Sequence, residues 1–310
     1  MIARSIIGGL ISFILSEGLI FSQAEVRGYR DIIFYYGNFL AVGTDGRIDN
    51  ISNSGEKKPV VCPNRNNLNC IACSRQIVVV GGDKGTILFS SDGKDFSTIE
   101  SGVNVKINGI SSGNGLFVAG AEGGIILISN NGSSWSSIIT EARGNIVSVT
   151  INDSFFIGIT DIGEILTSKD GFNWKIKDYN KEYSGYNKSC VFKKVLSTNN
   201  RIVIIGKHYD NSPVVLFSSL GNVWTERSLV YEDDQGMIQF LKNEPNAITY
   251  DSVRDQFFLA CAEGEIFNLP SCTKCNVSIK VSENDLLSII CENDLLLSVG
   301  EGFSINILRL

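Results

Sequence analysis

The chain alternates between short apolar runs and clusters of polar turn residues. Runs such as IVVVGG (77–82) and LFVAG (116–120) are rich in β-branched and aromatic side chains, and Gly, Asn, Asp and Ser separate them. Short runs of this composition between turn residues predict β-strands. We see no long segment of helical periodicity beyond the N-terminal stretch. The pattern therefore predicts an all-β protein.

A seven-residue phrase follows four of these apolar runs. It reads SSDGKDF (90–96), SNNGSSW (129–135), SKDGFNW (168–174) and SSLGNVW (218–224), with starting serines 39, 39 and 50 residues apart. Further strand-like segments precede each run, and another follows the aromatic residue of the phrase. One unit thus holds four short strands in about 39 residues. A fixed period of this length with four strands per unit is typical of a β-propeller blade.

Weaker copies of the unit extend the count to seven. Residues 29–61, 246–280 and 284–310 keep the same rhythm of strands. The second strand of each unit is marked by a small residue: Gly43, Gly82, Gly120, Gly158, Gly206, Cys261 and Gly300. We therefore predict an all-β, seven-bladed β-propeller of four-stranded blades, formed as a single domain by residues 25–310.

The recurring phrase suits a tight turn that each blade needs once. The oxygen of the Asp or Asn side chain can accept hydrogen bonds from backbone N–H groups two or three residues on, and glycine permits a positive φ at the next position. The aromatic residue anchors the following strand. Leu220 cannot accept these bonds, so the copy at 218–224 is expected to be looser. The residues assigned to this structural role are Asp92, Gly93, Phe96, Asn131, Gly132, Trp135, Asp170, Gly171, Trp174, Gly221 and Trp224.

The order of Ser, Asp, Gly and Trp in SKDGFNW (168–174) resembles the Asp-box, or BNR, repeat of sialidases, sortilin-type receptors and xyloglucan-degrading glycosidases. The phrase is one residue shorter than the commonest Asp-box. With its preceding F-x-A-V-G strand, it looks more similar to the propellers that resemble photosystem II assembly factors. The resemblance covers residues 29–310 and implies a propeller fold, but a shared fold carries many functions.

The N-terminal 24 residues are predicted to be a secretory signal peptide. Arg4 precedes an apolar run that is short for a membrane span, and Ser22–Ala24 offers a cleavage site of small residues. A second interpretation stays open, because the seventh unit ends after its third strand. Residues 15–26 can supply the missing strand, with Glu17, Gly18 and Phe21 in its turn. Export would place the protein outside the cell, in a periplasm or at the cell surface.

Candidate binding residues lie on the predicted top face, where the turns between second and third strands meet the blade-to-blade connections. Two of these connections, 175–192 and 225–246, are long and rich in Tyr and acidic residues, as recognition loops are. Six turns carry a carboxylate, which can form an acidic ring for a cation or basic partner or can simply suit a hairpin turn. The turn candidates are Asp45, Asp83, Glu122, Asp161, Glu263 and Glu301, and the connection candidates are Tyr179, Tyr183, Tyr186, Tyr231, Asp233 and Asp234.

The eight cysteines fit an oxidising compartment. Two C-x-x-C pairs, 70–73 and 272–275, have a spacing that can bind zinc, but they fall in different blades. Disulfides are preferred: Cys272 with Cys275, and Cys62 with Cys70 or Cys73. The lone histidine, His208, argues against a histidine-based metal site or triad and is expected in a solvated loop. We predict no metal site and no cofactor.

Composition and charge narrow the function. The formal charge is −6, and no Lys/Arg cluster indicates nucleic-acid binding. We expect an exported, monomeric, non-catalytic propeller that binds a protein or a glycan, with no catalytic residue assigned and no stable membrane span. One alternative is an assembly factor similar to the photosystem propellers. The other is a sialidase-like glycoside hydrolase, although the chain has few arginines and lacks the F/Y-R-I-P phrase of sialidases.

Overall fold

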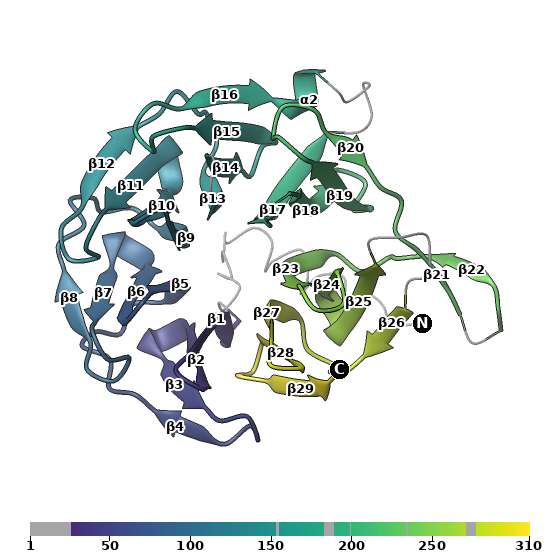
Figure 1. The fold of residues 1–310 in the computed structure, drawn as a ribbon, viewed down its shortest axis with the longest axis horizontal. Helices are drawn as coiled ribbons and strands as arrows, with labels where there is room; N and C mark the ends of the chain where they lie inside the picture. Colours follow the sequence, from purple (N-terminus) through teal and green to yellow (C-terminus); the bar gives the residue numbers. More distant parts are fainter. Residues whose placement is uncertain (1–25, 153–154, 183–188, 199, 234, 271–276) are drawn as a thin grey trace, which may run out of the picture.

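Seven antiparallel sheets surround a central axis like the blades of a propeller (Figure 1), as the repeat predicts. The structure, a computed structural model, describes residues 26–310 except 153–154, 183–188, 199, 234 and 271–276. Within each blade the chain runs from the innermost strand outward, and the next blade starts again at the centre (Figure 1). The sequence prediction of fold class is therefore confirmed.

The strands of blades 1 to 4 are as follows. Blade 1 holds β1 (Tyr29–Tyr35), β2 (Asn38–Gly43), β3 (Ile48–Ile51) and β4 (Lys57–Pro59), and blade 2 holds β5 (Leu68–Ser74), β6 (Ile77–Gly82), β7 (Ile87–Ser90) and β8 (Ser97–Ile99). Blade 3 holds β9 (Ile107–Gly113), β10 (Leu116–Ala121), β11 (Ile125–Ser129) and β12 (Ser136–Ile139), and blade 4 holds β13 (Ile146–Ile151), β14 (Phe156–Thr160), β15 (Glu164–Ser168) and β16 (Lys175–Asp178).

Two insertions lie in the connections before blades 5 and 6. Blade 5 holds β17 (Cys190–Ser197), β18 (Ile202–His208), β19 (Pro213–Ser218) and β20 (Thr225–Glu226), blade 6 holds β23 (Pro245–Asp251), β24 (Gln256–Cys261), β25 (Glu265–Pro270) and β26 (Val277–Lys280), and blade 7 holds β27 (Leu286–Glu292), β28 (Leu295–Gly300) and β29 (Ile305–Arg309). The short helix α2 (Tyr179–Glu182) precedes blade 5, and the hairpin β21 (Val230–Glu232)–β22 (Ile238–Phe240) precedes blade 6.

The hydrophobic core is divided among the contacts between neighbouring blades. Successive side chains of a strand point to opposite faces of its sheet. In β2, Phe39 and Ala41 therefore pack toward blade 7, whereas Leu40 and Val42 pack toward blade 2. Both faces of each blade are buried, which explains why its second strand reads as a continuous apolar run in the sequence.

Every innermost strand contains a β-bulge near its start. The pairing skips one residue in each of these strands, and the skipped residues are Arg30, Asn69, Asn108, Val147, Lys193, Asn246 and Leu287. A bulge adds twist and redirects a side chain. The side chains of Asn69, Asn108 and Asn246 are redirected in this way. Each donates a hydrogen bond, 3.0–3.2 Å long, to the carbonyl oxygen of the first residue in the next blade's inner strand. The repeated bulge therefore also joins neighbouring blades.

Blade 7 lies against blade 1 and completes the ring. Phe39 of blade 1 and Leu297 of blade 7 share one core cluster, and Gly28 forms a β-bridge with Glu301. In each blade, the N–H that follows the second strand donates to the carbonyl oxygen of the residue just before an inner strand, as from Asp83 to Asn67 (2.9 Å). The bond from Thr44 to Gly28 (3.0 Å) repeats this contact in blade 1. Blade 7 shows three strands within the described part of the chain. The predicted signal peptide and the alternative closing strand fall on residues 1–25, outside the described residues.

Candidate functional site

The recurring phrase forms the turn between the third and fourth strands. In blade 4, Ser168 Oγ accepts the N–H of Gly171 (2.9 Å), and Asp170 Oδ1 accepts two successive N–H groups, those of residues 172 and 173 (both 2.8 Å). The same three bonds recur around Asp92 and around Asn131. The N–H of Asn173, followed by its side-chain amide, holds the pKa of the Asp170 carboxyl below its usual range. The side chain therefore closes the turn as the sequence indicated.

The glycine of this turn also lies directly against the preceding blade. Gly93 and Gly132 have φ of 71° and 72°, and a Cβ there would come within 2.5 Å of the Tyr35 ring and 2.8 Å of Val79. The aromatic residue completes the turn, since the Trp135 indole N–H donates to the Gly132 carbonyl at 2.9 Å. Only glycine satisfies both the backbone conformation and the close contact.

The fourth copy, at 218–224 in blade 5, keeps only part of this geometry. Ser218 Oγ still accepts the N–H of Gly221 (2.8 Å), and Gly221 has φ of 73°. The Leu220 side chain has no oxygen to accept the two N–H groups that Asp170 accepts in blade 4. Trp224 is 5% exposed within the core between blades 4 and 5, and its indole N–H has no acceptor among the described residues. The loss of the Asx contacts follows from Leu220, whereas the position of Trp224 was not foreseen.

The six predicted carboxylates of the top turns do not occupy one equivalent position. The first residue of each turn is the one whose N–H donates to the carbonyl oxygen just before the inner strand. Four of the carboxylates occupy this first position: Asp83, Glu122, Asp161 and Glu301. Asp45 and Glu263 occupy the second position instead, with φ of 58° and 56°. The structure therefore does not bring the six side chains together as a regular ring, and their role in binding stays a prediction.

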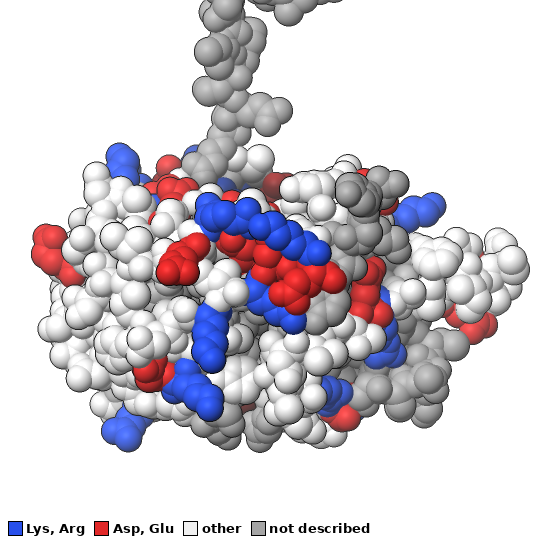
Figure 2. All heavy atoms as spheres, turned by 90° about the horizontal axis from the view of Figure 1, so that it is seen from above, with Lys and Arg blue, Asp and Glu red and all other residues white. Residues whose placement is uncertain are grey.

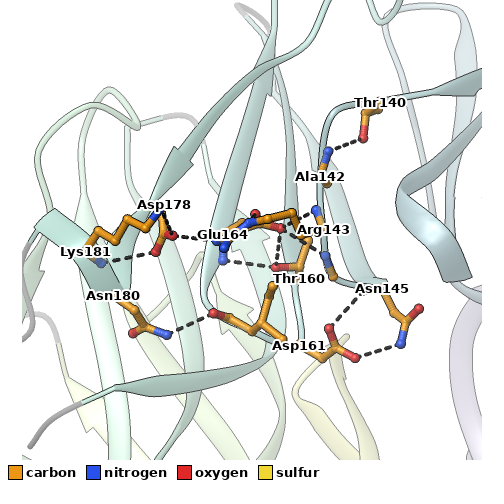
Figure 3. Close-up of polar contacts among 12 residues, drawn as sticks. Thr140, Ala142, Arg143, Asn145, Thr160, Asp161, Glu164, Asp178, Asn180 and Lys181 are labelled. Atoms are coloured by element: carbon orange, nitrogen blue, oxygen red, sulfur yellow. Dashed lines mark hydrogen bonds and ion pairs between the residues drawn. The ribbon is translucent and has the colours of Figure 1, made fainter.

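Two of these carboxylates serve as contacts within the scaffold. Asn145 donates to Asp161 through its backbone N–H (2.9 Å) and its side-chain amide (2.8 Å), as Figure 3 shows. The Asn145 side-chain oxygen also accepts the N–H of Gly123 in the preceding blade (3.0 Å). Asn67 joins the turns of Asp45 and Asp83 in the same manner. Each asparagine therefore connects two successive top turns.

A buried carboxylate that the sequence analysis missed holds the connection into blade 4. Glu164 is 2% exposed and accepts hydrogen bonds from the backbone N–H groups of Arg143 (3.0 Å) and Gly144 (3.1 Å) and from the Arg143 side chain (2.9 Å). The Arg143 guanidinium also forms an ion pair with Asp178, with Nη2 2.6 Å from Oδ2 (Figure 3). On the side of the ring seen in Figure 2, basic and acidic side chains lie beside one another, and no broad single-sign surface forms there.

The first long connection does not expose all of its predicted recognition residues. Tyr179, in α2, is 5% exposed and packs against Phe192, with ring centroids 5.7 Å apart. It therefore belongs to the core and not to a recognition surface, because a phenol ring buried between blades is unavailable to a partner. Tyr183 and Tyr186 lie outside the described residues.

The second long connection forms the hairpin β21–β22, which projects from the ring (Figure 1). Asp233 organises its tip: Oδ1 accepts the N–H groups of Gln235 (3.0 Å) and Met237 (2.9 Å), and Oδ2 accepts the Gln239 side-chain amide (2.9 Å). Tyr231 packs against Phe267 of blade 6. These two predicted recognition residues thus stabilise the hairpin, while Asp234 lies outside the described residues.

The hairpin presents three apolar side chains that the sequence analysis passed over. Met237, Ile238 and Phe240 are 59%, 63% and 66% exposed. Leu229 and Leu241, just outside the strands, are buried in the core between blades 5 and 6 and bonded to each other through their backbones (2.9 Å). The apolar residues in MIQF (237–240), within an insertion, were the available signal. We call Met237, Ile238 and Phe240 the apolar hairpin patch.

The cysteines are free thiols throughout the described part of the chain, so the predicted pairing of Cys62 is not formed. Cys70 and Cys73 are three residues apart in β5 and therefore face opposite sides of blade 2. Cys70 Sγ lies 4.0 Å from the Ile107 carbonyl oxygen in blade 3, whereas Cys73 packs in the same blade 1–blade 2 core as Cys62. This geometry rules out Cys70 as the partner of Cys62. Cys272 and Cys275 lie outside the described residues.

A chain of polar contacts links a buried thiol to the surface of blade 5. Cys190 Sγ lies 3.4 Å from His208 Nδ1, and His208 Nε2 lies 3.0 Å from Glu226 Oε1. His208 is 5% exposed, so its expected position in a solvated loop is wrong. Cys190 is fully buried while the Glu226 side chain is 38% exposed. A nucleophilic cysteine must instead meet its substrate, so this arrangement does not support catalysis at Cys190.

Inner-strand side chains bridge the central axis. Asp31 of blade 1 accepts hydrogen bonds from Ser288 Oγ (2.8 Å) and the N–H of Ile71 (3.1 Å), and Lys194 of blade 5 approaches it to 3.8 Å. No group of three or more His, Cys, Asp or Glu side chains with metal-binding geometry occurs among the described residues. No helix in the described part of the chain has the length and apolar character needed to cross a bilayer.

Known proteins share the fold with this chain at low sequence identity. No protein-family model matches the chain, and no curated protein matches its sequence. "YCF48 bound to D1 peptide" superposes with a TM-score of 0.69 at 14% identity and covers 92% of each chain. YCF48 from Cyanidioschyzon merolae gives 0.67 at 15%, covering 92% of this chain and 97% of that one. The WD40 propeller domain of Doa1 gives 0.68 at 13%, covering 91% and 92%. These similarities show the fold alone.

Proposed function

We propose that this protein is a non-catalytic binding module for a protein partner, which docks on the apolar hairpin patch. The observation that carries the proposal is the exposure of Met237, Ile238 and Phe240 on one projecting hairpin, where Ile238 and Phe240 share a face of β22. Apolar groups that gather at the surface of a soluble protein mark interaction sites. The coarser assignment, a binding or assembly module, is supported by the similarity of fold to YCF48, of which one solved structure is a complex with a D1 peptide.

The hairpin is built to keep the patch exposed. The Asp233 carboxylate holds the tip, and the buried side chains of Leu229 and Leu241 hold the base. The backbone bonds between Asp233 and Met237 and between Leu229 and Leu241 leave the N–H and C=O groups of residues 238 and 240 directed away from β21. An exposed strand edge with apolar side chains is a surface to which an extended segment of a partner can bind.

A triple variant tests the patch. Met237→Ser, Ile238→Ser and Phe240→Ser together should abolish retention of a stoichiometric partner from an extract of the native host. The purified partner should then bind the variant at least about tenfold more weakly, since three exposed anchors are lost. A matched control, Val61→Ser with Val253→Ser, removes apolar groups that are 84% and 83% exposed elsewhere and should bind normally. Equal binding by the triple variant, or retention of a glycan on an array in place of a protein, would contradict the proposal.

We also propose that the protein is exported, as a separate part of its function. The N-terminal 24 residues resemble a secretory signal peptide, and an exported propeller would meet its partner outside the cell or at the cell surface. N-terminal sequencing of the protein isolated from its host, combined with cell fractionation, tests this part. A start at Met1 in a cytoplasmic fraction would rule it out and leave the docking proposal standing.

A further inference from the structure

A second candidate site lies on the opposite face from the top turns, between the phrase turns of blades 4 and 5. A cavity of about 400 Å³ opens there. It is lined by Phe155, Leu220 and Gly221 on its apolar side and by Lys169, Lys175 and Asn222 among its polar residues. The cavity lies beside the one copy of the phrase, at 218–224, that lacks the Asx side chain.

Leu220 leaves two backbone donors without their usual acceptor. In blades 2, 3 and 4 an Asp or Asn oxygen accepts the two N–H groups that follow the turn glycine, at 2.8–3.0 Å. The equivalent N–H groups of Asn222 and Val223 meet no protein acceptor among the described residues, and both residues are exposed; Asn222 lines the cavity, and Val223 is the next residue along the chain. Gly221 keeps the φ of the other turn glycines and the bond to Ser218, so the backbone retains the shape that converges these donors on one point.

The charges around this point favour an anion. Lys169 and Lys175 both line the cavity. The one carboxylate that lines it, Asp170, has its oxygens engaged by the N–H groups of its own turn and by the Asn173 side-chain amide (2.7 Å). Lys177 donates to the Asn222 carbonyl oxygen at 3.2 Å and holds the turn in place. In the other copies of the phrase, the group that accepts these two N–H groups is the carboxylate of Asp92 or Asp170 or the side-chain amide of Asn131.

The apolar side of the cavity indicates what accompanies the carboxylate. Leu220 is 67% exposed and Phe155 is half-buried beside it. A side chain of Leu size fits the volume and would cover both residues, removing apolar surface from water. A carboxylate attached directly to a residue with an apolar side chain is the C-terminal end of a peptide.

We propose that the cavity between Leu220 and Lys169 binds the C-terminal carboxylate of a peptide with an apolar last residue. The carboxylate accepts the N–H groups of Asn222 and Val223 in place of the missing Asx side chain. Capture of a terminal carboxylate by converging backbone N–H groups is a known mode of peptide recognition. This site is separate from the apolar hairpin patch, so each proposal can fail without the other.

Leu220→Asp is the decisive variant, because it restores the residue that the repeat uses elsewhere and so should fold at least as well as the parent. The probe is acetyl-Ala-Ala-Ala-Ala-Leu with a free carboxylate, compared with the same peptide as its C-terminal amide, titrated calorimetrically and by ¹H–¹⁵N NMR. The full chain should bind the acid at least about tenfold more tightly than the amide. The amide resonances of Asn222 and Val223 should shift on binding.

The variants separate the two parts of the site. Leu220→Asp should lose the preference for the acid, while Leu220→Ala should keep the preference and bind several-fold more weakly. A peptide amide with an internal Asp tests the other source of a carboxylate, and binding as tight as that of the free acid would overturn the assignment to a chain end. Equal binding of acid and amide, or unchanged binding by Leu220→Asp, would overturn the site itself. The triple hairpin variant should bind the peptide normally, which distinguishes this site from the proposed docking surface.

Discussion

Replacing Glu164 with alanine tests whether the buried carboxylate holds the connection into blade 4. The side chain is 2% exposed and accepts the buried N–H of Gly144 at 3.1 Å and the half-buried N–H of Arg143 at 3.0 Å (Figure 3). Alanine would leave both donors without an acceptor, and an unsatisfied buried donor costs about 1–3 kcal/mol. With the Arg143 donor partly hydrated, Glu164→Ala should lower the free energy of unfolding by about 2–4 kcal/mol, a large share of the stability of most domains.

Two companion variants separate the backbone bonds from the ion pair. Both backbone N–H groups donate to the same carboxylate oxygen, Oε2, so Glu164→Gln can keep both of these bonds and should cost less than half as much as Glu164→Ala. Arg143→Ala keeps its own backbone N–H bond and removes only a guanidinium whose side chain is 57% exposed, so its effect should be much smaller. Urea denaturation followed by tryptophan fluorescence measures all three against the parent protein. An Arg143→Ala effect equal to that of Glu164→Ala, or a Glu164→Ala effect below about 0.5 kcal/mol, would refute the reasoning.

Three further predictions address the turns, the thiols and the N-terminus. Gly85→Ala should destabilise the fold far more than Gly115→Ala in the same denaturation assay. Both glycines have positive φ, but only at Gly85 would a Cβ meet the backbone, 1.9 Å from the Val103 carbonyl oxygen. Equal losses of unfolding free energy in the two variants would contradict this reasoning. Burial, followed by the Asp251 carboxylate, raises the pKa of Cys291 to about 11. Since only the thiolate reacts, alkylation of Cys291 followed by mass spectrometry should accelerate about tenfold per pH unit from pH 8 to 10; a rate that levels off between pH 9 and 10 would indicate an ordinary thiol. Deleting residues 1–24 should lower the melting temperature if residues 15–26 supply the fourth strand of blade 7, and an unchanged melting temperature would rule out that interpretation.

The strand pattern and the turn chemistry were readable from the chain because they act over a few neighbouring residues. The phrase around Asp92, Asn131 and Asp170 encodes hydrogen bonds between positions two or three apart, and its period reports the blade. The same local reasoning showed that Leu220 must lose these bonds. It could not show that the loss leaves two donors beside a cavity, because Lys169 and Phe155 reach that cavity from blade 4.

The candidate residues on the top face show the opposite case. Asp161 was recognised as a carboxylate in a turn, but its partner Asn145 comes from the connection that precedes its blade. Glu164 was overlooked because a glutamate at the start of a strand has no distinctive neighbours in the sequence. A tyrosine in a long connection predicts a recognition residue, yet α2 turns the ring of Tyr179 onto Phe192. Whether a polar or aromatic side chain meets solvent depends on segments far away along the chain.

The sequence by itself therefore determined the class of fold, the number of blades and the chemistry of the repeated corner, since periodicity and Asx turns are local properties. Only the tertiary structure decided which side chains remain exposed: it buried Tyr179 and His208, engaged Asp233 within its own hairpin, and left Met237, Ile238 and Phe240 at the surface. The physical reason is that burial is set by tertiary packing, which brings together residues that are separated in the sequence: Tyr179 and Phe192 are 13 positions apart, and equivalent positions of neighbouring blades are about 39 positions apart.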